Sequence, residues 1–366
     1  MNYYEKELNI IKKSNRLRDR KLFDDSLIDM ASNDYLGLST DKPLLKKAYK
    51  LLKKEKYLTP KASMLVNGYS KIHQNFEKKL CTLNRFENGI VVGSGFLANI
   101  SLIESLIRKR DILFIDEEYH ASGMLATKLS QGKIVFFKHN DIVDLEEKIE
   151  ENTLHNRFDR LVIAIEGVYS MQGDIAPKEI NDIAIKNDAI LVVDEAHSSG
   201  VIGKNLLGWF DYFNIKPQKN HIKMGTLGKA YASYGAYILA SNEIISFLEN
   251  RAKPIIYSTA PSLFDIAQAS VNLDFIQRHK KYYKRRIREF QSISKIILGI
   301  KTKSLILPIE IGDNKKVLEL QQNLIKKGYL VGAIRQPTVK KAILRVILRL
   351  DIKKKDLHRA LGYLKN

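Results

Sequence analysis

The chain contains few of the features that mark secreted or membrane proteins. Its 366 residues include a single cysteine, Cys81, so no disulfide can form within one chain and a reducing compartment is expected. The longest apolar runs, such as 189–193, fall far short of the roughly 18 residues that a membrane-spanning helix needs. The first residues lack the basic and then apolar pattern of a secretory signal. The sequence therefore predicts a soluble cytoplasmic protein without membrane contact.

The sequence also lacks the phosphate-binding loop of ATPases and helicases, although residues 193–200 read VDEAHSSG. That loop has the form G-x-x-x-x-G-K-[ST], and its backbone amides wrap the nucleotide phosphates. In the Gly-Lys pairs at 203–204 and 228–229 the preceding glycine stands too close, and Asn205 or Ala230 follows where serine or threonine is required. We therefore reject a magnesium–nucleotide site, expect no metal, and seek another role for Asp194 and His197.

Acidic residues are outnumbered in this chain. The 61 lysines and arginines against 41 aspartates and glutamates give a net charge of +20. Such a charge favours anionic partners in general, which include nucleic acid, a membrane surface, coenzyme A and an acidic carrier protein. The lysine-rich stretches, such as 44–56, lie on periodic helical patterns and not in separate tails. We interpret the charge as spread over solvated faces, and we expect no nucleic-acid partner.

Short apolar runs alternate with helical periodicity from about residue 85 to residue 240. The runs are 89–93, 112–116, 133–138, 160–167, 189–197, 221–226 and 236–240. Strands and helices that alternate with short connections form a mostly parallel sheet, covered by helices on both faces. The sequence therefore predicts an α/β fold for this region.

The pattern differs at both ends of the chain. Residues 1–22 form an amphipathic helical pattern, with Tyr4, Leu8, Ile11 and Leu17 on one side. After residue 241 we expect a long helix at 262–298, strands at 305–311, 329–334 and 344–350, and helices at 315–327 and from 353. We predict three parts: an N-terminal helix and arm (1–40), a large α/β domain (41–240), and a long connecting helix with a small α+β domain (241–366).

Polar residues follow several predicted strands, at the edge where open parallel sheets bind their ligands. Asp194 ends one strand, and His197 follows on the exit loop. Lys229 lies just past the next strand, among small residues that leave room for a flat ring. Pyridoxal phosphate requires a lysine that forms a Schiff base and a carboxylate that keeps the pyridine nitrogen protonated. These residues fit it, although a purely structural Asp–Lys pair remains the alternative.

Other strand ends carry polar groups as well. The free amides of Gly95 and Phe96, at the start of a predicted helix, suit a phosphate group. His120 follows another strand end, where an imidazole can stack over a ring, and Glu166 and Ser170 follow a third. Each feature is weak by itself, but together they favour a cofactor site.

Nine motifs, in this order, resemble those of the α-oxoamine synthases, which are pyridoxal-phosphate-dependent acyltransferases with the fold of aspartate aminotransferase (fold type I). They are SNDYLGLS (32–39), NGYSKIHQNFE (67–77), GSGFLAN (93–99), DEEYHAS (116–122), EGVYSMQGD (166–174), VVDEAHSSGVIG (192–203), TLGKA (226–230), IYSTAPS (256–262) and AIRQPTV (333–339). The resemblance covers nearly the whole chain and implies a homodimeric enzyme.

Within this family the motifs favour the branch that uses alanine and a long acyl chain. That branch implies the decarboxylative condensation of L-alanine with pimeloyl-CoA or a pimeloyl-acyl carrier protein, in biotin biosynthesis, with release of carbon dioxide and a free thiol. The alternatives are a glycine-using sister enzyme, an ordinary aminotransferase, and a basic nucleic-acid-binding protein on a degraded enzyme scaffold.

The resemblance also implies roles for individual residues. Lys229 would bind the cofactor as a Schiff base, Asp194 would pair with the pyridine nitrogen, His197 would bond the ring oxygen, and His120 would stack on the ring and contact substrate. The other expected cofactor contacts are Gly95, Phe96 and Thr226 at the phosphate, Ser170 beside the cofactor, and Thr259 at the phosphate of the neighbouring subunit.

The expected substrate contacts are Arg18, Asn33 and Thr338, with Arg345 as the clamp of the amino acid carboxylate. The stretch from Thr338 to Arg345 is about two residues shorter than is usual in the family, so Arg349 remains the alternative clamp. Two further departures are Gln172, which replaces an aspartate, and the segment TPKASMLVNGY (59–69), which replaces a glycine-rich run. The second departure leaves the acyl preference open.

Overall fold

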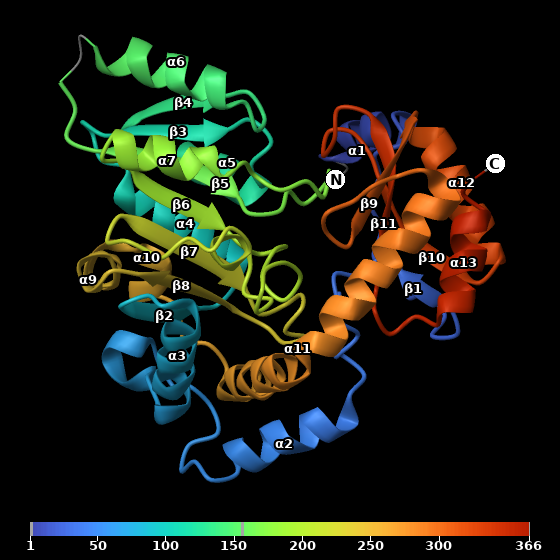
Figure 1. Cartoon of the computed structure of the whole chain (residues 1–366), viewed down its shortest axis with the longest axis horizontal. Coiled ribbons are helices and arrows are strands. Elements are labelled where there is room, and N and C mark those ends of the chain that lie inside the picture. The colour runs from blue at the N-terminus through green and yellow to red at the C-terminus, as the bar shows by residue number, and fades with distance from the viewer. Residues whose placement is uncertain (1–2, 155–156, 366) are drawn as a thin grey trace. The chain divides into compact units, whose positions relative to one another are not determined.

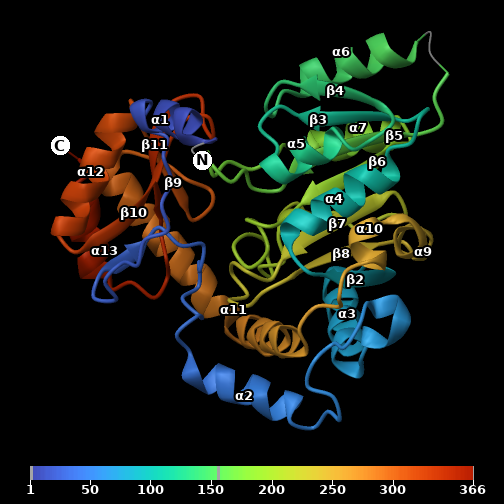
Figure 2. The same cartoon turned by 180° about the vertical axis from the view of Figure 1, so that it is seen from behind.

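The computed structural model describes residues 3–154 and 157–365, and these form two compact units (Figures 1 and 2). The large unit consists of Leu36–Ser170 and Asp174–Lys284. The small unit consists of the described residues up to Tyr35, of Met171–Gly173, and of those from Arg285 onward. The domain limits expected from the sequence stay a prediction. No helix in the described part of the chain is long and apolar enough to span a bilayer.

A seven-stranded sheet forms the centre of the large unit, in the order β2-β8-β7-β6-β5-β3-β4. Its strands are β2 (Asn88–Val92), β3 (Ile112–Asp116), β4 (Lys133–Phe137), β5 (Leu161–Glu166), β6 (Ile190–Asp194), β7 (His221–Thr226) and β8 (Ala236–Ala240). Among these described strands β8 runs in the opposite direction to the other six. Every residue of β3, β5 and β8 is buried, as apolar runs covered on both faces require. The predicted α/β fold is confirmed.

Helices cover both faces of this sheet, and α4 and α7 lie on opposite sides of it (Figures 1 and 2). The described helices of the large unit before residue 260, whether or not they contact the sheet, are α2 (Lys42–Leu52), the π-helix η1 (Met64–Gly68), α3 (Lys71–Asn84), α4 (Gly95–Leu106), α5 (Ala121–Thr127), α6 (Ile142–Thr153), α7 (Glu179–Lys186), α8 (Trp209–Tyr212), α9 (Asn242–Arg251) and α10 (Lys253–Ile256). Several begin at a residue whose side chain accepts a free backbone N–H, as Asp41, Ser94 and Ser241 do.

A four-stranded sheet, in the order β1-β10-β11-β9, organises the small unit. Its elements are β1 (Ile28–Met30), β9 (Ile306–Gly312), α12 (Asn314–Lys326), β10 (Tyr329–Ile334), β11 (Ala342–Ile347) and α13 (Lys354–Gly362). β1 runs parallel to β10, and the other two pairs are antiparallel. β11 is buried throughout and carries Arg345. The strand predicted at 344–350 is therefore displaced: β11 begins two residues earlier than predicted and ends three residues earlier.

The predicted long helix is α11 (Leu263–Leu298), and it takes part in both units. His279 interrupts it with non-helical angles (φ −106°, ψ 15°). The Nδ1 atom of His279 lies 2.8 Å from the carbonyl oxygen of Phe275, four residues earlier. The side chain thus competes for a carbonyl that the helix would otherwise use, which explains the kink.

The N-terminal helix is shorter than predicted. Helix α1 spans Glu5–Lys13, whereas the pattern predicted 1–22, of which residues 1–2 lie outside the described residues. The chain leaves the helix at Asn15, whose φ of 53° is left-handed, a conformation that asparagine tolerates and that ends helices. None of the residues of α1 is buried, so the apolar side of the pattern, including Leu8, is exposed.

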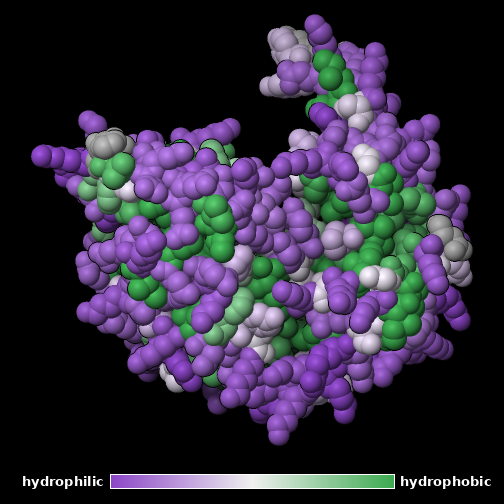
Figure 3. All heavy atoms as spheres, turned by 45° about the horizontal axis from the view of Figure 1, so that its top comes forward, coloured by the Kyte–Doolittle hydropathy of each residue, from purple (hydrophilic) through white to green (hydrophobic). Residues whose placement is uncertain are grey.

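The surface carries most of the charged residues. Figure 3 shows hydrophilic residues over most of one face, with apolar residues between them in separate patches. On this face the hydrophilic residues are spread over the surface, as expected for charged side chains that are exposed to solvent.

Candidate active site

A pocket of about 210 Å³ in the large unit collects the ends of several parallel strands. It is lined by Gly95, Phe96, Asn99, His120, Ser122, Glu166, Asp194, Ala196, His197, Met224, Thr226 and Lys229. Glu166, Asp194 and Thr226 are the last residues of β5, β6 and β7. The structure therefore brings together, in one cavity, seven of the predicted site residues together with Glu166.

Lys229 and His197 are in direct contact in this pocket. The Nζ atom of Lys229 lies 2.8 Å from the Nε2 atom of His197. Lys229 lies in a tight turn between β7 and β8, in which the Leu227 amide donates to the Gly235 carbonyl over 2.9 Å. Gly235 adopts a φ of 117°, which favours glycine, and this conformation lets the chain return at once into β8. The turn thus holds the lysine at the edge of the sheet.

Asp194 belongs to a buried hydrogen-bond network that also holds His120. Its Oδ2 atom accepts a bond of 2.9 Å from the Asn99 side-chain amide, which also donates to the Ser122 hydroxyl over 2.9 Å. That hydroxyl lies 2.7 Å from His120 Nδ1, and the Ser122 backbone amide donates to the same nitrogen over 3.2 Å. The sequence analysis missed Asn99 and Ser122. The signal for Asn99 was a polar residue one turn after Gly95, at the end of the GSGFLAN motif.

The protonation of His120 follows from its surroundings. Burial lowers the pKa of its imidazole, Lys229 lowers it further, and Asp194 opposes both, so that the pKa lies below its ordinary value of 6.5. Because Nδ1 accepts the Ser122 amide, the neutral ring carries its proton on Nε2. His120 therefore presents a hydrogen-bond donor in its neutral form.

The start of α4 offers a cradle for an anion. The amides of Gly95 and Phe96 lie in the first turn, where a helix leaves its N–H groups without intrahelical partners. Ser94 caps the helix and accepts a bond of 3.2 Å from the Leu97 amide. A Cβ atom added at Gly95 would lie 3.8 Å from the hydroxyl oxygen of Thr226, so that hydroxyl stands beside the free amides. These donors suit a phosphate group.

Two predicted cofactor residues do not line the pocket. Ser170 is buried, and its backbone amide donates to Oε2 of Glu166 over 3.1 Å. Thr259 lies exposed between α10 and α11. Its contact with a neighbouring subunit stays a prediction.

Four of the five predicted substrate residues, all but His120, lie in the small unit and form two pairs. Arg18 donates to the Thr338 hydroxyl over 2.9 Å, and Arg345 donates to the Asn33 side-chain oxygen over 3.0 Å. The partners are more than 300 residues apart in the sequence.

Arg349, the alternative clamp, is bound by acidic residues of its own unit. Its guanidinium lies 2.6 Å from Asp29, 2.8 Å from Asp351 and 3.5 Å from Asp34. Burial lowers the pKa of Arg349, but these three carboxylates outweigh it and raise the pKa. Its positive charge is therefore already neutralised within the fold, which favours Arg345 for a substrate carboxylate.

Glu195, next to Asp194, has a different task. It is fully buried and accepts hydrogen bonds from the Ser198 hydroxyl and from the backbone amides of Trp209 (2.5 Å) and Phe210 (3.3 Å). The ammonium group of the buried Lys223 lies 3.4 Å from it. The second acid of the DEAH stretch thus fixes the start of α8 and does not line the pocket.

A half-buried ion-pair cluster ties three other segments together. His139 lies between Asp116, at the end of β3, and Asp174, at distances of 3.1 Å and 2.9 Å. The Tyr169 hydroxyl and the Asn140 amide donate to Asp116 as well. Burial lowers the pKa of His139, but the hydrogen bonds and charges of the two aspartates outweigh it and raise the pKa to about 10. His139 is therefore an imidazolium ion at neutral pH.

We expect this cluster to make stability fall in alkali. Because the folded-state pKa of His139 lies above its ordinary value, the contribution is complete below about pH 6.5 and is lost as the pH rises through about 10. Allowing for solvent screening, the loss is on the order of 3 kcal/mol. Urea unfolding of the wild type and of a His139→Gln variant, from pH 6 to pH 10, measures it. A difference between the two proteins that stays constant with pH would contradict the prediction.

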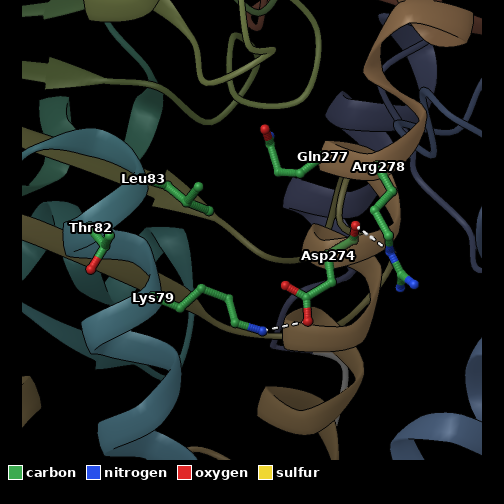
Figure 4. A pocket seen from close by; sticks show the side chains of 6 residues that line it. All are labelled: Lys79, Thr82, Leu83, Asp274, Gln277 and Arg278. Carbon is green, nitrogen blue, oxygen red and sulfur yellow. Dashed lines mark hydrogen bonds and ion pairs between the residues drawn. The ribbon is translucent and has the colours of Figure 1, made fainter.

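A larger groove, of about 590 Å³, lies between α3 and α11 (Figure 4). It is lined by Lys79, Thr82, Leu83, Asp274, Gln277 and Arg278. Lys79 donates to Asp274 over 2.6 Å and to the Ser270 hydroxyl over 2.8 Å, so its charge is largely neutralised. The groove contains neither a strand end nor a histidine, and we place the chemistry in the smaller pocket.

The segment that departs from the usual glycine-rich run keeps one glycine where the backbone requires it. A Cβ atom added at Gly68 would lie 2.0 Å from the carbonyl oxygen of Ala62, because η1 turns sharply there. Lys61 has a left-handed φ of 67°, and its ammonium lies 4.0 Å from the centre of the Tyr57 ring. The segment thus keeps glycine at position 68, where a side chain would clash, and has a lysine in a left-handed conformation at position 61.

Residues 25–364 match the aminotransferase class I and II family. The chain is 46% identical over 348 residues to the curated 8-amino-7-oxononanoate synthase of Helicobacter pylori strain J99. The matched region covers 95% of this chain and 92% of that protein. The chain belongs to the class I and II aminotransferase family, within the group of 8-amino-7-oxononanoate synthases.

Solved structures agree with this assignment. The 8-amino-7-oxononanoate synthase of Francisella tularensis has a TM-score of 0.79 at 27% identity, over 93% of this chain and 98% of that chain. A serine palmitoyltransferase of Sphingomonas wittichii has a TM-score of 0.88 at 23% identity, over 100% and 98% of the two chains, and shows the shared fold. The predicted fold type I is confirmed.

Proposed function

We propose that this chain is a cytoplasmic, pyridoxal-phosphate-dependent acyltransferase of biotin biosynthesis. It condenses L-alanine with a pimeloyl thioester to give 8-amino-7-oxononanoate, carbon dioxide and the free thiol. The observation that carries the proposal is the pocket in which Lys229, Asp194, His120 and His197 meet. The Helicobacter pylori relative, 46% identical over 95% of this chain, bears the name of this activity.

The donors around the pocket fit pyridoxal phosphate. The amides of Gly95 and Phe96, with the Thr226 hydroxyl, would hold the phosphate group. Asp194 would bind the pyridine nitrogen, and Lys229 would bond the aldehyde carbon. When bound, this cofactor supplies an electron sink for a carbanion next to an amino group. Asp194 suits its role because the Asn99 side-chain amide and the Ala196 backbone amide both donate to its oxygens and hold the carboxyl group in place.

The chain's own residues then move protons and orient groups. The Lys229 amine takes the α-proton of alanine, and His197, 2.8 Å away, orients that amine. His120 donates from Nε2 to the thioester carbonyl oxygen as the alanine Cα bonds to the carbonyl carbon. The carbon–sulfur bond breaks, the thiol leaves, carbon dioxide is lost, and a proton returns to the same carbon.

Thiol release by the purified protein tests this function. With pyridoxal phosphate and L-alanine, we expect thiol release from pimeloyl-CoA or a pimeloyl-acyl carrier protein, with 8-amino-7-oxononanoate identified by mass spectrometry. Faster turnover of glycine with acetyl-CoA or succinyl-CoA would indicate a sister enzyme. Transamination of a keto acid without carbon dioxide would indicate an aminotransferase. Salt-sensitive DNA or RNA binding without bound cofactor would indicate the nucleic-acid alternative.

The two candidate arginines give a matched pair of variants. We expect Arg345→Lys to raise the KM for L-alanine by about tenfold or more, because an ammonium group cannot form two parallel bonds to a carboxylate. Arg349→Lys is expected to lower the melting temperature, because Arg349 binds three aspartates, and to leave the KM for L-alanine unchanged. Steady-state kinetics and thermal unfolding of both variants check this. The reverse pattern would assign the clamp to Arg349.

We also propose that the enzyme is a homodimer in which Thr259 contacts the phosphate site of the neighbouring subunit. Large apolar side chains near this residue are exposed, with Tyr257 at 79% and Val66 at 77%. The segment that contains Tyr257 and Thr259 lies beside the segment that leads to Val66, because the Ala260 amide donates to the Ala62 carbonyl over 3.0 Å. Such a surface suits burial against a second copy of the chain. Sedimentation equilibrium tests the dimer.

A further inference from the structure

Glu166 is a second carboxyl group in the active-site pocket, directly beside Asp194. It ends β5 as Asp194 ends β6, and the two residues are register partners in the parallel pair. Only 2% of Glu166 and 3% of Asp194 is exposed. The proposed function assigns a role to Asp194 but none to Glu166.

One oxygen of Glu166 has a partner and the other has none. Oε2 accepts the Ser170 amide over 3.1 Å. Oε1 is buried, and no atom of the described residues makes a hydrogen bond to it. A buried carboxyl oxygen left without a partner costs free energy, so its place in the wall of a pocket indicates a partner supplied by a ligand.

The charges around Glu166 decide which form it takes. Burial raises the pKa of its carboxyl group, Asp194 raises it further, and Asp116 adds to this, whereas Lys229 and the Ser170 amide lower it. The net effect places the pKa well above its ordinary value. The oxygens of Asp194 accept two N–H donors, from Asn99 and Ala196, whereas those of Glu166 accept one, from Ser170.

We propose that Glu166 is a neutral carboxylic acid that donates a hydrogen bond from Oε1 to an acceptor atom of the molecule bound in this pocket. A neutral acid has one O–H donor, whereas a carboxylate has none. An electron-rich oxygen on a flat ring is the class of acceptor that fits. The inference rests on the proposed function for the identity of that ring, and it makes Glu166 a residue that contacts the cofactor.

Two substitutions separate a donor from a charged acceptor. Glu166→Gln keeps the size of the side chain, remains neutral and still offers an N–H donor. We expect its dissociation constant for pyridoxal phosphate to stay within about twofold of the wild type. Glu166→Ala removes the donor and is expected to raise that constant about fivefold to tenfold. Titration of the cofactor-free protein, followed by fluorescence, measures both values. Glu147→Ala, on the exposed side of α6, is the surface control.

Infrared spectroscopy of the cofactor-free protein tests the protonation itself. At neutral pH the wild type should show the C=O stretch of a protonated carboxyl group that is missing in Glu166→Gln and present in Glu147→Ala. This result does not depend on which molecule binds, so failure of the wild type to bind pyridoxal phosphate would overturn the proposed function alone.

Three outcomes would overturn the inference. The first is no difference in this infrared band between the wild type and Glu166→Gln. The second is that Glu166→Gln weakens cofactor binding as much as Glu166→Ala does, since Glu166 would then act as a charged acceptor. The third is unchanged binding in both variants, with melting temperatures that show both to be folded.

Discussion

Replacing Lys229 by alanine is expected to lower kcat for thiol release by at least about 10²–10⁴-fold, the range that a positioned general base contributes. The reason is geometric, because Lys229 is the amine held in contact with His197 at 2.8 Å in the pocket. No other lysine of the described chain lines this cavity. The same variant should lose the borohydride-trapped link between protein and cofactor, which mass spectrometry of tryptic peptides detects.

Lys204 is a matched control for this experiment. It follows Gly203, as Lys229 follows Gly228, and it is exposed. Lys204→Ala should keep both turnover and the trapped link. A Lys229→Ala variant that still traps the cofactor on another lysine would remove the basis of the proposed function.

The strands of the large unit could be predicted because their apolar runs are continuous. A run that is buried on both faces has few alternatives, and the segments 112–116 and 221–226 coincide with β3 and β7. Lys229, Asp194 and His197 could be located for a related reason, since strand ends of a parallel sheet share one edge. These predictions used only local pattern and sheet topology.

What the sequence could not show depends on contacts between distant residues. Asn99 bonds Asp194 across 95 positions, and no local pattern encodes that pairing. The choice between the arginines, left open by the shortened stretch before Arg345, depends on the carboxylate of Asp29, which binds Arg349 from 320 positions away. The end of α1 was missed because a helical period predicts a helix but not the residue at which the backbone leaves it, here Asn15.

Asp194 and Glu195 show how strand geometry divides two neighbouring acids. Side chains alternate in direction along an extended backbone, so adjacent residues at the end of β6 point apart. Asp194 lines the pocket, whereas Glu195 accepts the amides that begin α8. Gly208 is tied to this arrangement, because a Cβ atom there would lie 1.7 Å from the Oε2 atom of Glu195.

Removing Glu195 is expected to be among the most destabilising single changes in this protein. Glu195→Ala leaves the ammonium group of Lys223, which is 1% exposed, without its carboxylate. Breaking a buried pair in this way costs about 3–5 kcal/mol. Burial lowers the pKa of Lys223, and the charges of Glu195 and, to a smaller extent, Asp211 oppose this, so the variant also favours loss of the proton. Urea unfolding at neutral pH measures the change in the free energy of unfolding.

The opposite substitution should cost less, and the asymmetry tests the explanation. In Lys223→Met the carboxylate of Glu195 keeps its bonds from Trp209, Phe210 and Ser198, so its charge remains stabilised. Among the described residues, Lys223 donates to the uncharged Leu207 carbonyl and pairs with the carboxylate of Glu195, and Asp211 is a further negative charge that acts on it. A Lys223→Met variant as unstable as Glu195→Ala would mean that the ion pair, and not the amides of α8, holds Glu195 in place.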